Sequence, residues 1–319
     1  MTDPATPAAA AVIVVNYGSS QLLAENLLAL ARRAPWLTVV VVDSFSTAAE
    51  RGRVAALADA EGWLAVLPEG NPGFGGGMNL GVARAREAGA QRFLLLNPDA
   101  RIEPEASAAL LRATEADPMA LVAPVVLRPD GSVWSAGADV SLVDGRMTSA
   151  RRRPQPAESR AEPWLSGACL AVSERLWGLV GGFAEEYFLY WEDVELSVRV
   201  TRAGGSLVLL EQVTAVHAEG GTQQQGAASA ATAKSEGYYY YNIRNRLLFA
   251  ARNLAPDDVE RWEALAPRVA WEILLQGGRR QFLKPVVPLR AALRGIRDGR
   301  RLVAASEGGA GIARVGRTT

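Results

Sequence analysis

Short runs of valine and leucine alternate with helical segments over the first hundred residues, and this alternation constrains the fold more than any other feature. Each run is apolar, rich in β-branched residues and followed by polar residues or glycine, which is typical of a buried strand. The predicted strands cover residues 9–15, 37–42, 63–67 and 92–96. Helices are predicted at 19–30 and 47–60. This order favours an α/β fold, a Rossmann-like and mostly parallel sheet flanked by helices.

Polar side chains follow three of these strands at the point where each strand ends. Asn16 and Asp43 end the first two, and Asn97, Pro98 and Asp99 follow the last. The carboxyl ends of parallel strands share one edge of a sheet, where such folds bind ligands. Asp43 is a candidate acceptor of hydrogen bonds from a nucleotide base or ribose, although capping of the next helix explains it equally well. Asp99 is a candidate oxygen ligand for a divalent cation that bridges a diphosphate, and the alternative is an acid in a turn.

The glycine-rich segment at residues 71–79 does not have the spacing of a dinucleotide-binding loop. Whether counting begins at Gly73 or at Gly75, the third glycine of G-x-G-x-x-G is missing. No G-x-x-x-x-G-K-S/T loop exists either, because both lysines of the chain lie elsewhere. We expect the glycines to let the backbone approach a ligand, with Asn79 adding a polar contact at the start of a helix. A tight structural turn is the alternative.

An acidic pair, Glu192 and Asp193, lies inside an aromatic stretch at the predicted start of a helix. A carboxylate in that setting can act as a general base. His217, the single histidine, follows an apolar strand-like segment. A lone histidine is more often structural, but beside Asp99 it becomes a candidate second ligand of the same cation. Together with Asp43, these acids indicate an enzyme.

The composition excludes several other classes of protein. With 319 residues, 49% of them hydrophobic, the chain can bury a full core. Because 34 basic residues balance 34 acidic ones, no overall field attracts nucleic acid. One cysteine excludes an internal disulfide, and no apolar run reaches the ~18–20 residues that span a bilayer. Residues 1–11 lack the basic start of a secretory signal, so we expect a cytoplasmic protein, free or at the inner face of the membrane.

The second half of the chain has two predicted loops and a helical end. Residues 140–162 have turn residues and little apolar periodicity, so we expect a mobile loop over the crevice. Residues 220–229 are small and polar and are predicted as another loop, with helices from 235 onward. We therefore expect a catalytic domain at 1–223 and a helical C-terminal extension at 224–319.

The helical extension contains a strongly basic segment. Residues 278–301 carry eight arginines and lysines against one aspartate, a local excess of +7. An amphipathic segment of this kind can rest on anionic lipid as a peripheral membrane contact. A solvated helical face and a homodimer contact are the alternatives.

Six segments, taken in this order, resemble the family 2 glycosyltransferases with the GT-A fold, and most closely their rhamnosyltransferase-like branch. The resemblance covers roughly residues 11–253. The segments are Val-Val-Asn-Tyr at 14–17, Val-Val-Asp-Ser-Phe-Ser-Thr at 41–47, Asn-Pro-Gly-Phe-Gly-Gly-Gly-Met-Asn at 71–79, Leu-Leu-Asn-Pro-Asp-Ala at 95–100, Gly-Gly-Phe with Tyr-Trp-Glu-Asp-Val-Glu-Leu within 181–196, and Val-His with Gly-Gly-Thr within 216–222.

The resemblance implies a role for each matching residue. Asp193 would be the catalytic base with Glu192 beside it, and Asp99 would hold Mg²⁺ or Mn²⁺, for which His217 is the candidate second ligand named above. Residues implied at the nucleotide sugar are Asn16, Tyr17, Asp43, Asn71, Gly75, Asn79, Asn97 and Arg246. Residues implied at the acceptor are Trp164, Gly167, Tyr190 and Trp191.

The reaction implied is inverting transfer of a sugar from a nucleotide donor, with dTDP-L-rhamnose favoured, to a hydroxyl of a glycan, lipid-linked saccharide or natural product. Two positions depart from the family pattern. Asn97 stands in place of the first acid of D-x-D, and Ser44-Phe45 in place of a small pair after Asp43. A non-catalytic carbohydrate-binding protein and a nucleotidyltransferase remain the alternatives, although no basic loop follows the first strand.

Overall fold

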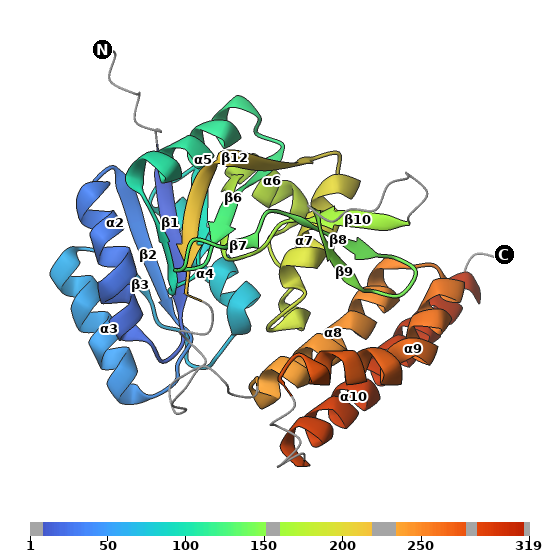
Figure 1. Ribbon diagram of the computed structural model, residues 1–319. Helices are drawn as coiled ribbons and strands as arrows, with labels where there is room; N and C mark the ends of the chain where they lie inside the picture. Colours follow the sequence, from blue (N-terminus) through green and yellow to red (C-terminus); the bar gives the residue numbers. More distant parts are fainter. Residues whose placement is uncertain (1–8, 151–159, 219–233, 279–285, 316–319) are drawn as a thin grey trace.

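The computed structural model describes residues 9–150, 160–218, 234–278 and 286–315, with side chains as far as residue 306. Four strands of the first hundred residues are parallel and lie in the order β3-β2-β1-β4 (Figure 1). They are β1 (Ala10–Asn16), β2 (Leu37–Asp43), β3 (Leu64–Val66) and β4 (Arg92–Leu96). The predicted alternation of strands and helices is confirmed here, and Asn16 pairs with Asp43 at the shared edge.

The other half of the large sheet is mixed, which the prediction of a mostly parallel sheet did not anticipate. β11 is antiparallel to both of its neighbours, β4 and β6, while β12 is parallel to β6. The sheet continues in the order β4-β11-β6-β12-β5, with β7 paired to β6. These strands are β5 (Ala100–Ile102), β6 (Ala120–Leu127), β7 (Val133–Ser135), β11 (Cys169–Ser173) and β12 (Ser206–His217).

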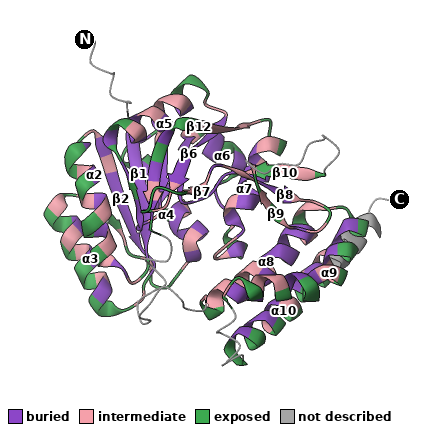
Figure 2. Ribbon diagram, in the orientation of Figure 1, coloured by how far each residue is buried: buried purple, intermediate pink, exposed green. Residues whose placement is uncertain are grey.

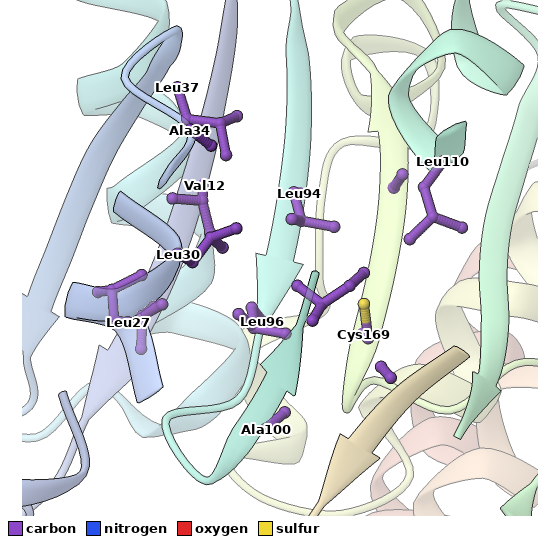
Figure 3. Packing of buried hydrophobic residues seen from close by; sticks show 14 of the residues in the cluster. Val12, Leu27, Leu30, Ala34, Leu37, Leu94, Leu96, Ala100, Leu110 and Cys169 are labelled. Carbon is purple, nitrogen blue, oxygen red and sulfur yellow. The ribbon is translucent and has the colours of Figure 1, made fainter. Parts of the chain in front are cut away.

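Helices cover both faces of the sheet, because successive side chains of a strand point to opposite faces. On β1, Val12 and Val14 belong to one core cluster and Ile13 and Val15 to the other. Figure 3 shows the first cluster, where Leu30 lies next to Val12, and Leu110 and Cys169 lie beyond Leu94. The helical elements of this domain are α1 (Ser20–Leu22), the π-helical segment η1 (Leu23–Leu27), α2 (Leu28–Arg33), α3 (Ala48–Glu61), α4 (Gly73–Glu87), α5 (Pro104–Ala116), α6 (Glu174–Val180), the short 3₁₀-helix η3 (Glu185–Tyr187) and α7 (Glu192–Arg202).

The segment predicted as a loop over the crevice contains strands instead. β8 (Ala138–Ser141) pairs antiparallel with β9 (Met147–Ser149) and β10 (Ala161–Trp164) in a small second sheet. Short strands with turn residues between them carry little periodicity, which explains the error. Residues 151–159 of this segment, and the predicted loop at 220–229, lie outside the described residues.

The C-terminal region is helical, as predicted, and its three described helices lie side by side at one end of the molecule (Figure 1). They are α8 (Glu236–Asn253), α9 (Pro256–Leu275) and α10 (Val286–Val315). Their inner faces are buried and their outer faces exposed (Figure 2). A shared core cluster joins this region to the start of α7: Trp191 and Val194 pack with Phe249 and Trp262. Among the described residues, no helix combines the length and apolar character needed to cross a membrane.

Candidate active site

Asn16 and Asp43 lie side by side at the carboxyl ends of β1 and β2, as predicted. Asn16 Nδ2 donates to Asp43 Oδ1 at 3.0 Å, and both side chains are buried. Arg51, from the first turn of α3, donates from Nε to Asp43 Oδ2 at 3.2 Å. The Arg51 guanidinium also lies over the Phe45 ring, 4.5 Å from its centre. The carboxylate of Asp43 is thus fixed and charge-paired at the carboxyl end of β2, and Thr47 is the residue that caps α3.

The glycine-rich segment is itself the start of α4, which begins at Gly73 rather than at Asn79 as predicted. A Cβ on Gly73 would lie 2.3 Å from the Phe188 carbonyl oxygen, and one on Gly75 would lie 2.9 Å from Phe183 Cβ. These glycines therefore let α4 approach the chain that precedes the acidic pair. Asn71 Oδ1 accepts from the Gly73 N–H at 2.8 Å and fixes the turn into the helix.

Asn79 has protein partners in place of the predicted nucleotide contact. Its Nδ2 donates to the Phe183 carbonyl at 2.9 Å and to Glu185 Oε1 at 3.0 Å, while its Oδ1 accepts from the Phe183 N–H at 2.9 Å. Two hydrogen bonds to one backbone unit make Asn79 a brace between α4 and the segment at 183–185.

Asp99 and His217 come together, as predicted, although 118 positions separate them in the chain. His217 Nε2 lies 3.0 Å from Asp99 Oδ1 and 3.5 Å from Asn97 Nδ2. Antiparallel pairing of β12 with β5 explains the meeting, because His217 pairs with Ala100. The Trp134 ring lies against the imidazole, with 4.6 Å between ring centres.

The group of Asn97, Asp99 and His217 suits a divalent cation that also binds a diphosphate. Among the described residues, the buried Asn97 Oδ1 and His217 Nδ1 have no hydrogen-bond partner. One carboxylate, one amide oxygen and one imidazole are hard or borderline donors acceptable to Mg²⁺ or Mn²⁺, and diphosphate oxygens would complete the shell. No cluster of three or more acidic, histidine or cysteine ligands occurs in the described residues, so the protein alone offers a weak site.

Asp193 lies in the first turn of α7 and is connected to the candidate cation site. Its Oδ2 accepts from the Gly167 N–H at 2.9 Å and its Oδ1 from the Val194 N–H at 2.9 Å. Ala168, the residue after Gly167, accepts through its carbonyl from the Asn97 N–H at 3.0 Å. Gly167 and Ala168 thus join the candidate base to the candidate diphosphate site through two hydrogen bonds.

Burial raises the pKa of Glu192 to about 8, and the charge of Asp193 adds to the effect. Burial also raises the pKa of Asp193, but the two N–H donors oppose this by stabilising its ionised form. Glu192 Oε2 has no partner among the described residues. Burial and the charge of Asp193 thus favour the protonated form of Glu192, while the two N–H donors favour the ionised form of Asp193.

Only some of the residues predicted to contact the acceptor are exposed to solvent. Trp164 and Tyr190 are partly exposed, and Gly167 is the donor to Asp193. Trp191 is only 5% exposed, and its ring packs on Phe249 and Trp262. The Trp191 ring is part of the core, so its burial argues against the predicted contact with the acceptor.

Arg246 has a structural environment rather than the predicted place at a diphosphate. Its side chain is 2% exposed, donates to the carbonyls of Trp262 (3.0 Å) and Asp144 (2.7 Å), and lies over the Trp262 ring. Burial lowers the pKa of Arg246 to about 10. Tyr17, in contrast, is half exposed beside Asn16, where a ligand can reach it.

Two residues of the site escaped the sequence reasoning. Arg51 neutralises Asp43, and its position eight residues after the strand end, beside Phe45, was the available signal. Asn245 donates to backbone carbonyls just before the acidic pair, from a helix that begins more than forty residues further along the chain. No local pattern indicates a contact of that range.

Solved glycosyltransferases share this architecture. The mannosyltransferase PcManGT from Pyrobaculum calidifontis, in complex with GDP-Man and Mn²⁺, is similar over 96% of this chain and 86% of its own, with a TM-score of 0.54 and 19% identity. GalNAc-T7 with UDP, GalNAc and Mn²⁺ covers 76% of this chain and 50% of its own, with a TM-score of 0.53 and 15% identity. At such identities the likeness shows the fold, which is that of the GT-A glycosyltransferases.

Sequence comparisons then give the family. Residues 11–164 match Glycosyl transferase family 2. The N-acetylglucosaminyl-diphospho-decaprenol L-rhamnosyltransferase of Mycobacterium tuberculosis (strain H37Rv) is 32% identical over 234 residues, which cover 65% of this chain and 75% of that protein. The dTDP-rhamnosyl transferase RfbF of Shigella flexneri is 22% identical over 248 residues, or 76% of this chain and 80% of that protein. The chain belongs to glycosyl transferase family 2.

Proposed function

We propose that this protein transfers L-rhamnose from dTDP-rhamnose, with inversion, to a hydroxyl of a saccharide carried on a polyprenyl diphosphate. The names of the two rhamnosyltransferase relatives support the donor, and that of the mycobacterial relative supports the acceptor. The observation that carries the proposal is the link from Asp193 through Gly167 and Ala168 to Asn97. It joins a candidate base to the group suited to a diphosphate.

The reaction follows from that arrangement. Asp193 removes the proton of the acceptor hydroxyl as its oxygen bonds to the anomeric carbon of the donor. The bond from that carbon to the phosphate oxygen breaks, and the nucleoside diphosphate leaves with the electron pair. A cation held by Asp99, Asn97 and His217 would neutralise charge on the departing diphosphate. Direct displacement inverts the anomeric carbon, and Glu192, kept protonated, leaves Asp193 as the ionised acid.

We expect dTDP with Mn²⁺ to raise the melting temperature of the purified protein more than UDP, GDP or NAD does. Binding to the folded state stabilises it by about 2.7 kcal/mol at a hundred times Kd, which corresponds to roughly 4 °C for a chain of this size. In Asp99→Asn the part of the shift that needs Mn²⁺ should disappear. A shift with NAD alone, or with no nucleoside diphosphate, would contradict the proposed function.

Contact with a lipid surface is proposed for the adjoining ends of α9 and α10. Ala270 and Leu274 of α9 pack with Ala291 and Ala292 of α10, so these ends are neighbours. Apolar side chains exposed around them are Trp271, Leu275, Val286, Val287 and Leu293. Tryptophan and aliphatic side chains next to an exposed arginine, Arg290, match the boundary between lipid headgroups and acyl chains. In Figure 1 the start of α10 lies at the lower side, toward which β1 and β2 direct their carboxyl ends.

Vesicles that contain about one third phosphatidylglycerol should sediment the protein, and the double variant Val286→Ser, Val287→Ser should reduce the bound fraction several-fold. Leu179→Ser is the matched control, since Leu179 is equally exposed on α6. A mass that doubles with concentration and returns to that of a monomer in the double variant would assign this face to a dimer instead.

A further inference from the structure

The backbone that leads into the acidic pair adopts unfavourable conformations. Phe188, Tyr190 and Trp191 have φ values of 62°, 66° and 74°, in a region that side chains other than glycine seldom occupy. At Phe188 the ψ of −55° and the 2.7 Å hydrogen bond from the Leu189 N–H to the Tyr187 carbonyl describe a γ-turn of the rare, strained kind. Such conformations persist only where surrounding contacts enforce them.

Asn245 of α8 supplies those contacts. Its Nδ2 lies 2.7 Å from the Tyr187 carbonyl oxygen and 2.8 Å from those of Leu189 and Tyr190. The side chain is fully buried. Arg244 Nη1 donates to Asn245 Oδ1 at 2.5 Å, which turns the amide so that its N–H groups face the three carbonyls.

The strained segment is fixed from its other side by the start of α4. The Phe74 N–H donates to the Phe188 carbonyl at 2.7 Å, which the absence of a Cβ on Gly73 permits. Trp191 is the residue before α7, so its backbone conformation sets where the first turn of that helix, with Glu192 and Asp193, begins. A shift of this segment moves Asp193 with it.

We propose that Asn245 is a positioning residue for transfer: it holds residues 187–191 so that α7 presents Asp193 to the acceptor hydroxyl. This inference rests on the proposed role of Asp193 as the base. It makes the helical C-terminal region part of the catalytic apparatus through a side chain, Asn245, that acts on Asp193 through the backbone. Asp43 and Asp99 lie on other elements, so donor binding does not depend on Asn245.

The test compares Asn245→Ala and the milder Asn245→Ser with the wild type, using dTDP-rhamnose and a short-chain polyprenyl diphospho-N-acetylglucosamine. We expect kcat to fall about 10- to 100-fold in the alanine variant and less in the serine variant, because a misplacement near 1 Å can cost about 10²-fold. The KM for dTDP-rhamnose and the melting shift with dTDP and Mn²⁺ should stay within about threefold of the wild type.

Asn242→Ala is the matched control, because Asn242 lies on the same helix and donates to the Tyr238 carbonyl of that helix. A purely structural role predicts a lower melting temperature in the Asn245 variants with an unchanged kcat per folded molecule well below that temperature, and this result would overturn the inference. If the alanine variant does not fold, the serine variant decides by the same criteria. Wild-type activity in Asp193→Asn would instead refute the proposed base, and that outcome is separate.

Discussion

Asparagine in place of Asp193 is expected to lower kcat by about 10²- to 10⁴-fold while the affinity for dTDP stays unchanged. The two side chains have nearly the same shape, and the asparagine Oδ1 can still accept one backbone N–H. An amide, however, cannot take the proton of the acceptor hydroxyl, and general base catalysis typically contributes 10²- to 10⁴-fold. Removing the charge beside buried Glu192 offsets part of the cost of the backbone hydrogen bond that asparagine loses. The measurement is initial-rate transfer of rhamnose, together with the melting shift caused by dTDP.

Asp130→Asn is the control, since Asp130 lies in an exposed turn and accepts from Ser132. Activity near that of the wild type in Asp193→Asn would assign the base to another group. A wild type that binds dTDP but transfers no sugar to any hydroxyl acceptor would support a non-catalytic carbohydrate-binding protein. Loss of dTDP binding in Asp193→Asn would place this acid at the donor.

The part of the site that could be predicted follows from the parallel strands. Their carboxyl ends meet at one edge, so Asn16 beside Asp43 follows from strand order alone. Strand order alone does not predict that Asp99 lies beside His217. Their contact depends on the antiparallel pairing of β12 with β5, which no periodicity in the sequence indicates. His217 was predicted beside Asp99 from its chemistry as a candidate second ligand, and the antiparallel pairing that joins them was not predicted.

The glycines and Asn79 were interpreted differently because their partners lie about a hundred positions away. A glycine that lets two segments approach and a glycine that lets a ligand approach look the same in a sequence. Gly73 and Gly75 lie against residues 183–192, and Asn79 against Phe183. The role of Arg246 could not be predicted for the same reason. Its guanidinium is enclosed by Trp262 of α9, a contact that the local sequence does not indicate.

Glutamine in place of Glu192 is expected to make the protein more stable at pH 8.5 by a few kcal/mol, with little change at pH 4.5. In the folded protein burial and the charge of Asp193 raise the pKa of Glu192 to about 8, against 4.5 for the free side chain. Between these values the folded state holds a proton that the unfolded state has lost. The free energy of unfolding therefore falls by up to about 1.4 kcal/mol per pH unit as pH rises through this window. Glutamine does not titrate, so the variant lacks this slope.

Urea unfolding of both proteins from pH 4.5 to 8.5 measures the difference directly. Asp193→Asn serves as the matched variant: it keeps Glu192 buried but removes the neighbouring charge, so its slope should end at a lower pH than that of the wild type. Equal slopes in the wild type and Glu192→Gln would show that Glu192 is ionised in the folded protein. In that case two adjacent carboxylates would both carry charge, and the assignment of the base to Asp193 alone would lose its electrostatic support. If the slope disappears as expected, Glu192→Gln should keep activity within a few-fold at pH 7, because glutamine mimics the protonated acid.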